Sequence, residues 1–142
     1  MHQTLRTLER IREHQERIAR VNFVEVRSRR DEASDALGAL QRRLSLLRTD
    51  RGTDTSDVAR HHLFQVQMEM VRRQQAAGLE QMDLDLAEAQ ARWNAARQST
   101  RKVTRLAELA EAKTAREQAK KEAKELDETG RMAWWKGQGE SV

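Results

Sequence analysis

Residues 79–103 read LEQMDLDLAEAQARWNAARQSTRKV, and this stretch decides the fold. Its apolar and small residues recur at alternating intervals of three and four positions: Leu79, Met82, Leu86, Ala89, Trp93, Ala96, Thr100 and Val103. Because an α-helix has about 3.6 residues per turn, this spacing places all of them on one face of a helix. The pattern is typical of the packing seam of a coiled coil.

The helix that contains this seam is predicted to run from about residue 58 to 129, because only the isolated Gly78 interrupts it before Gly130. An earlier helix, from about residue 4 to 48, carries a second heptad seam with one charged interruption: Val26, Arg30, Ala33, Leu37, Leu40, Leu44 and Leu47. Leu5, Leu8, Ile11 and Ile18 form a similar stripe in another phase. We therefore expect a slip in register between Val21 and Val26.

A turn is predicted at residues 49–57, TDRGTDTSD, because this segment gathers a glycine with side chains that compete for backbone hydrogen bonds. Gly52 suits the left-handed cap of the first helix, and Thr55, Ser56 or Asp57 can cap the second. The sequence thus predicts an all-α fold: an antiparallel two-helix coiled coil, or helical hairpin, with a longer second helix. We expect a single coiled-coil domain over residues 1–142, with a flexible tail at 130–142.

The length difference between the two predicted helices has a consequence for the second one. If the hairpin folds about Gly52 and Thr53, Leu5 meets the region of Thr100 to Lys102. The end of the second helix then has no partner within the chain. Such a segment either binds another molecule or frays.

Composition excludes a globular core, because 35% of the 142 residues are charged and only 4% are aromatic. The chain has no cysteine, hence no disulfide or thiolate metal site, which fits a reducing compartment such as the cytoplasm. Residues 1–20 contain no apolar segment of the kind that signal peptides have, and no run of about 18 apolar residues occurs, so neither export nor membrane spanning is expected. The sequence predicts a soluble protein that is at most peripheral to a membrane.

The charge pattern argues against nucleic-acid binding, although the net charge is +4. The 27 basic residues are interleaved with 23 acidic ones, as on a solvated helix surface. The spacing of the histidines supports no shared metal site: His2, His14, His61 and His62. Without a phosphate loop, a nucleophile turn or a convergent carboxylate pair, we expect a protein that is not an enzyme and needs no cofactor.

Two apolar stripes begin the second helix, about 120° apart around it. The first stripe is Ala59, Leu63, Val66 and Met70, and the second is Phe64, Met68 and Val71, extended by Gln75. The second continues into Leu79 and Met82, which favours it as the seam and leaves the first exposed. A local register change that half-buries both is the alternative. A surplus apolar face predicts a docking site near the turn.

Two adjacent tryptophans stand out near the end of the sequence. Trp134 and Trp135 precede Lys136 in a segment that also contains glycines. Large aromatic side chains seldom lack a contact. They are expected to touch a partner or a bilayer interface, or to be disordered.

The stretch REQAKKEAKELDE at residues 116–128 resembles the closing signature of FliJ proteins, roughly E-Q-K-x-L-D-E. Alanine stands at 123, where glutamine is usual, and the matching residues are Glu122, Lys124, Leu126, Asp127 and Glu128. Trp93 with the basic run after it, the polar turn near residue 52 and the chain length also fit that family. The resemblance therefore covers nearly the whole chain.

The resemblance implies a cytoplasmic component of the flagellar type III export apparatus, peripheral on the cytoplasmic side of the inner membrane. FliJ proteins are hairpin coiled coils, similar to the shaft of rotary ATPases, that insert into the hexameric export ATPase. They also contact the cytoplasmic domain of the export gate and bind export chaperones. By resemblance, the signature residues contact the ATPase, and the residues that match the family's gate-binding patch are Phe64, Met68, Val71 and Gln75.

Three other functions are compatible with the same residues. The equivalent stalk of a virulence-type secretion system shares the architecture, and genomic neighbourhood would separate the two. A basic coiled coil that binds nucleic acid would lose affinity steeply with salt. A structural homo-oligomer would show a mass that depends on concentration.

Overall fold

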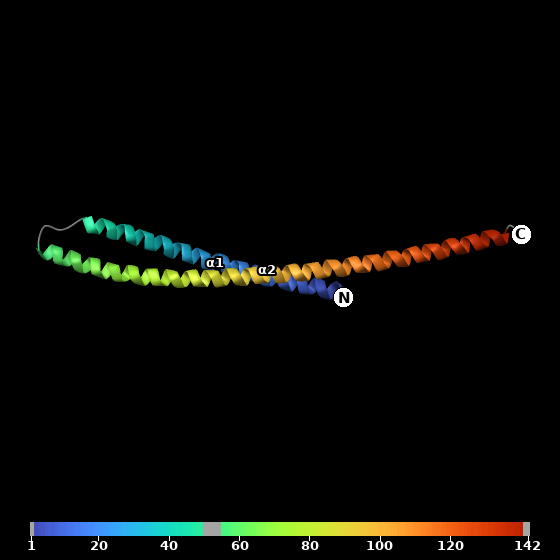
Figure 1. Ribbon diagram of the computed structural model, residues 1–142, viewed down its shortest axis with the longest axis horizontal. Coiled ribbons are helices and arrows are strands. Elements are labelled where there is room, and N and C mark those ends of the chain that lie inside the picture. Colours follow the sequence, from blue (N-terminus) through green and yellow to red (C-terminus); the bar gives the residue numbers. More distant parts are fainter. Residues whose placement is uncertain (1, 50–54, 141–142) are drawn as a thin grey trace. The chain divides into compact units, whose positions relative to one another are not determined.

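The computed structural model describes residues 2–49 and 55–140, and each of these residues is helical. Helix α1 spans His2–Thr49 (48 residues) and helix α2 spans Thr55–Glu140 (86 residues). Figure 1 shows both helices with their labels. No strand occurs in either of these ranges. The predicted all-α hairpin with a longer second helix is confirmed.

The turn was predicted at residues 49–57, but its described residues are helical: Thr49 ends α1, and residues 55–57 begin α2. Residues 50–54, including the proposed cap Gly52, lie outside the described residues. Thr55, Ser56 and Asp57 already belong to the first turn of α2. Asp57 places a negative charge there, at the positive end of the helix dipole, where it is stabilising.

Backbone packing divides the chain into two units, which are described separately. The first unit comprises residues up to His14 together with those from Gln98 onward, and the second comprises Gln15–Arg97. Each unit therefore contains a segment of α1 and a segment of α2. A single coiled-coil domain over the whole chain stays a prediction.

The second unit is held by an antiparallel seam. Leu37, Leu44 and Ala89 are buried in it. Phe23 packs on Trp93 with 5.2 Å between the ring centroids, and Arg30 Nε donates a 2.7 Å hydrogen bond to Asp83 Oδ1. Since a later position in α1 meets an earlier position in α2, the helices run in opposite directions.

The first unit has a core of small side chains. Thr100, Val103 and Ala107 are buried on α2, and Leu5 is half-buried on α1. Arg6, the next residue, binds Glu111. Leu5 therefore lies near residue 111 and not opposite Thr100 to Lys102 as predicted. The prediction took the register from the midpoint of the turn, whereas side-chain packing between the two helices sets it.

The seam of α1 is continuous along the whole helix, so the predicted register slip between Val21 and Val26 is wrong. Buried and half-buried positions follow one unbroken heptad rhythm: Leu5, Glu9, Arg12, Glu16, Ala19, Phe23, Val26, Arg30, Ala33, Leu37, Leu40, Leu44 and Leu47. Leu8, Ile11 and Ile18 are exposed. A stutter distorts the winding of a coiled coil. Here polar side chains occupy seam positions instead, and Glu9 and Arg30 do so with hydrogen-bond partners in reach.

The end of α2 also differs from the expected break at residue 129. The helix continues through Gly130, Gly137 and Gly139 to Glu140, so the predicted helix end at about residue 129 is wrong. Flexibility of residues 130–142 stays a prediction. None of the described glycines has a positive φ. A glycine costs a helix only about 1 kcal/mol relative to alanine, whereas a proline, which this chain lacks, costs about 3.

Burial on α2 stops well before the helix ends. Ala110 is the last half-buried residue, and every side chain described from Glu111 to Gly139 is exposed. We call residues 112–139 the extension. Exposure over its full length agrees with the expectation that the second helix outruns the first.

Candidate partner-binding surfaces

The beginning of α2 presents one apolar stripe to solvent and another to the edge of the seam. In the first stripe Leu63, Val66 and Met70 are exposed, and Met70 retains 60% of its accessible surface. In the second, Met68 and Val71 are half-buried, Phe64 is 38% exposed and Gln75 is exposed. The second stripe thus lies at the seam, as its continuity with Leu79 predicts, and the first faces away from it.

A side chain-to-backbone hydrogen bond joins the two helices near this surface. The carbonyl oxygen of Leu47 lies 2.6 Å from His61 Nε2, which donates to it in the tautomer protonated there. Carbonyl groups in the last turn of a helix lack an intrahelical donor. His61 therefore caps α1 and fixes the start of α2 beside it.

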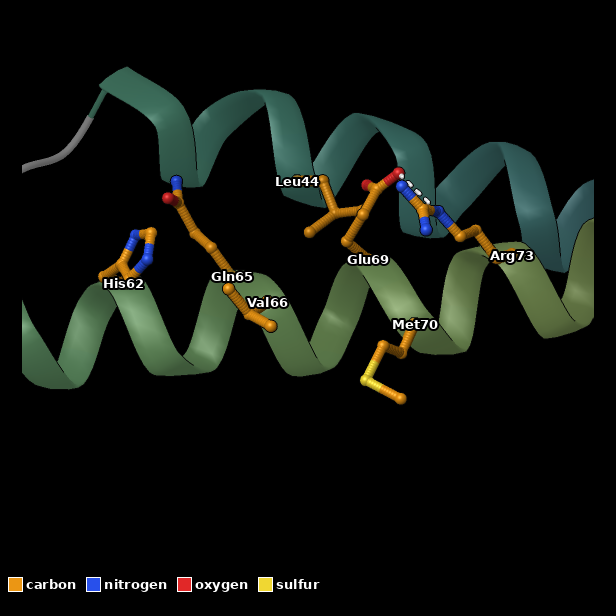
Figure 2. Close-up of a pocket in the computed structure, with 7 residues that line it drawn as sticks. All are labelled: Leu44, His62, Gln65, Val66, Glu69, Met70 and Arg73. Atoms are coloured by element: carbon orange, nitrogen blue, oxygen red, sulfur yellow. Dashed lines mark ion pairs between the residues drawn. The ribbon is translucent and has the colours of Figure 1, made fainter.

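A shallow groove of about 330 Å³ opens beside this junction. Its lining comes mostly from α2, with one residue from α1: Leu44, His62, Gln65, Val66, Glu69, Met70 and Arg73. Figure 2 shows Leu44 pointing from α1 toward α2, Gln65 and Glu69 pointing toward α1, and Met70 pointing away from it. The groove is therefore open on the side of the exposed stripe.

Charged side chains form the rim of the groove. Arg72 donates hydrogen bonds of 2.6 and 2.9 Å to Glu69 Oε1, and Arg73 Nε lies 3.9 Å from the same oxygen. The hydrogen bonds from Arg72 to Glu69 raise the pKa of the Arg72 guanidinium. A groove lined by apolar and charged side chains together suits contact with a protein. The described residues contain no group of His, Asp or Glu that could hold a metal.

The extension carries the signature residues as a second exposed surface. Glu122, Lys124, Leu126, Asp127 and Glu128 are all exposed. At 100° per residue they point in different directions around the helix and do not share one face. Gln118 donates a 3.2 Å hydrogen bond to Glu122, and Thr129 donates one of 2.9 Å to the Glu125 carbonyl, so local contacts support the helix here.

Comparison with known proteins assigns this architecture to a family. The family model described as "Flagellar FliJ protein" matches residues 1–139, nearly the whole chain. The chain belongs to the FliJ family. Searches among curated proteins and among solved structures found no match. As a FliJ family member, the protein is a component of flagellar protein export, which confirms the family that the signature suggested.

Sequence reasoning missed a polar cluster of this FliJ chain. In the first unit Arg6 donates to both Glu9 and Glu111, over 2.7 to 3.1 Å. Hydrogen bonds from Thr104 and then Arg6 lower the pKa of the Glu9 carboxyl, and those to Glu111 and Glu9 raise the pKa of Arg6. The available signal was Glu9, four residues after Leu5, but the apolar pattern assigned Leu8 and Ile11 to the stripe instead.

Trp93 forms an aromatic contact between α1 and α2 in the second unit. Phe23 covers one part of its ring, and the Arg97 guanidinium lies 5.3 Å from the ring centroid. Its buried Nε1 has no hydrogen-bond partner among the described residues. The ring therefore acts through packing and its cation–π contact, and it presents no polar atom to a ligand.

The described helices include none that is long and apolar enough to cross a bilayer.

Proposed function

We propose that this FliJ-family chain is the coiled-coil stalk of the flagellar type III export apparatus and acts without catalysis, by contact with the hexameric export ATPase. The observation that carries the proposal is the extension, a helix whose described side chains are exposed on every side. The FliJ signature lies within it, at residues 122–128.

A ring-shaped partner explains this distribution of exposed signature residues better than a flat one. A flat surface contacts one face of a helix, whereas the signature residues point around the whole circumference. A helix inside a ring meets several subunits at once. If its sides differ, it binds the conformations of the subunits unequally and thereby shifts their equilibrium.

The second proposed contact is with the cytoplasmic domain of the export gate, at Phe64, Met68, Val71 and Gln75. Supporting it, Phe64 and Gln75 are exposed, and Met68 and Val71 keep part of their surface open at the edge of the seam. We also propose binding of export chaperones, on the family assignment alone.

The proposed location is the cytoplasm, with peripheral attachment on the cytoplasmic side of the inner membrane. There the stalk reaches both the ATPase and the gate. Two facts support this location: the family is flagellar, and the described helices include no candidate for a membrane span.

The proposal is tested by capturing partners of the tagged chain from a lysate of its own cells and identifying them by mass spectrometry. We expect the flagellar export ATPase. Three results would contradict the proposal. They are recovery of a virulence-type ATPase, recovery of nucleic acid whose binding falls steeply as the salt concentration rises, and recovery of further copies of this chain alone.

The gate contact is tested separately, with purified gate domain. Phe64→Ala should weaken binding, and the adjacent Leu63→Ala, on the stripe that faces away from the seam, is the matched control. If both variants bind the gate domain equally well, Phe64 does not take part in the contact. Weaker binding by Leu63→Ala alone would move the contact to the first stripe.

A further inference from the structure

Residues 129–139 of α2, read TGRMAWWKGQG, differ chemically from the rest of the extension. Between residues 112 and 128 acidic and basic residues alternate, but from 129 to 139 no acidic residue occurs. Arg131 and Lys136 are the charged residues of this segment, which we call the tryptophan segment. It therefore has a positive charge together with the largest aromatic side chains of the extension.

The apolar side chains of the tryptophan segment are open to solvent. Trp134 is 58% exposed and Trp135 is 66% exposed, and Met132 is exposed as well. The two indole rings touch edge to face, with centroids 5.9 Å apart. This contact leaves most of both side chains in water, so the molecule alone does not account for two adjacent tryptophans in a largely polar extension.

The directions of these side chains limit what can cover them. With about 3.6 residues per turn, Trp134 points about 100° away from Trp135 and about 160° away from Met132. A groove on a protein covers one face of a helix. It cannot bury side chains on nearly opposite sides at once, whereas a fluid interface surrounds a helix end that dips into it.

We propose that the tryptophan segment binds the surface of a bilayer that contains anionic lipids, with Met132, Trp134 and Trp135 at the level of the headgroups. Indole rings favour this layer because one part of the ring is apolar and the N–H finds polar partners there. Arg131 and Lys136 complement the negative headgroups, and their long stems keep the charges at the water side.

The alternating charges upstream fit a contact at the surface rather than insertion. Glu125, Asp127 and Glu128 precede the segment and would be repelled by anionic lipid. The described helices include no stretch apolar enough to span the bilayer. Residues 129–139 alone therefore enter the interface, while the charged residues before them and Glu140, the acidic residue that ends α2, stay in water.

The test uses the purified full chain with vesicles of phosphatidylglycerol and phosphatidylcholine, and with vesicles of phosphatidylcholine alone. Flotation measures binding, and the wavelength of tryptophan emission reports transfer of the indoles out of water. We expect binding and a blue shift with the anionic vesicles. The double variant Trp134→Ala/Trp135→Ala should bind at least about tenfold more weakly, because burial of one large apolar side chain alone corresponds to roughly that factor.

The matched control is Leu106→Ala/Leu109→Ala, which removes two exposed leucines from the same unit outside the tryptophan segment. It should bind like the unchanged chain. Arg131→Gln/Lys136→Gln should lose the preference for phosphatidylglycerol. Circular dichroism of each variant checks that its helix content is retained, as expected for exposed positions.

Two results would overturn the proposal: no flotation of the unchanged chain with anionic vesicles, or equal flotation of the double tryptophan variant. Loss of a protein partner by that variant, with no vesicle binding by the unchanged chain, would assign the segment to a protein contact and also overturn it. Since only this chain and lipid are present in the vesicle assay, its outcome is independent of the ATPase and gate contacts.

Discussion

The guanidinium of Arg6 binds the carboxylate of Glu111 through two parallel hydrogen bonds, from Nε to Oε1 and from Nη2 to Oε2, each 2.7 Å long. Two-point pairing fixes the orientation of both groups as well as their distance. In the first unit this pair stands where burial on α2 ends, because all described side chains from residue 112 to 139 are exposed. The Arg6–Glu111 pair therefore lies at the start of the extension, the segment that we propose to contact the ATPase.

The seam of the second unit is tested by two leucines of opposite burial. Leu37 is buried, whereas Leu84 is exposed. Leu37→Ala should lower the free energy of unfolding by about 2 kcal/mol, at the low end for core truncations because a two-helix seam is narrow. Leu84→Ala should change it by less than about 0.5 kcal/mol. Chemical denaturation measures both, and the reverse ranking would show that the seam is misplaced.

The continuous seam of α1 predicts that its exposed isoleucine contributes little to stability. Ile18 is 57% exposed, and Phe23 is half-buried against Trp93. Ile18→Ala should stay within about 0.5 kcal/mol of the unchanged chain. Phe23→Ala should cost about 1–3 kcal/mol, since it removes part of a core and an aromatic contact. If thermal melts show Ile18→Ala as the more harmful change, α1 does contain a register slip.

Two methionines at the start of α2 separate its two stripes. Met68 is half-buried and Met70 is largely exposed. Met68→Ala should destabilise the hairpin by about 1–2 kcal/mol, less than a full core truncation, and Met70→Ala should be nearly neutral. The comparison needs only melting curves. Similar losses from both would indicate that both stripes are half-buried.

The polar cluster of the first unit predicts a loss of stability in acid. Hydrogen bonds from Thr104 and Arg6 lower the pKa of Glu9 below its ordinary value of 4.5. The charged carboxylate therefore stabilises the fold above the unfolded-state pKa, and this contribution disappears as the pH falls through the lower folded-state value. Melting temperature should fall over that range.

The matched variant for the acid effect is Glu9→Gln, which carries no titrating group at this position. Its melting temperature should depend less on pH between neutrality and strong acid than that of the unchanged chain. Thr104→Val, which removes the hydrogen bond that lowers the pKa most, should reduce the dependence as well. Identical pH profiles for all three proteins would show that Glu9 is not coupled to folding.

Hydropathy predicted the seam of α2 well, because its pattern is uninterrupted: Ala89, Thr100 and Val103 are buried as their spacing requires. It failed in the first part of α1, where Glu9 and Glu16 take seam positions and Ile18 is exposed. A polar residue is accepted in a seam when partners are in reach. For Glu9 the partner Thr104 is distant in sequence. A pattern of neighbouring residues therefore cannot show that this hydrogen bond offsets the cost of placing a carboxylate in the seam.

The candidate surfaces were foreseen to different extents. The signature at residues 122–128 was recognisable from its letters, since a linear motif needs no fold to be identified. The groove near Met70 was not, because its lining combines Leu44 of α1 with residues of α2. The helical path through Gly130 was missed, because a propensity cost of about 1 kcal/mol is too small to end a helix by itself.

The most direct test of the central claim compares stimulation of the purified flagellar export ATPase by the full chain and by two truncated chains. Deletion of residues 116–142 removes the signature, and deletion of residues 129–142 removes the tryptophan segment but keeps the signature. Circular dichroism first checks that both truncated chains retain a cooperative helical melt. We predict that the longer deletion abolishes stimulation and that the shorter one preserves it. Full stimulation by the folded chain that ends at residue 115 would contradict the claim that the extension is the contact with the ATPase.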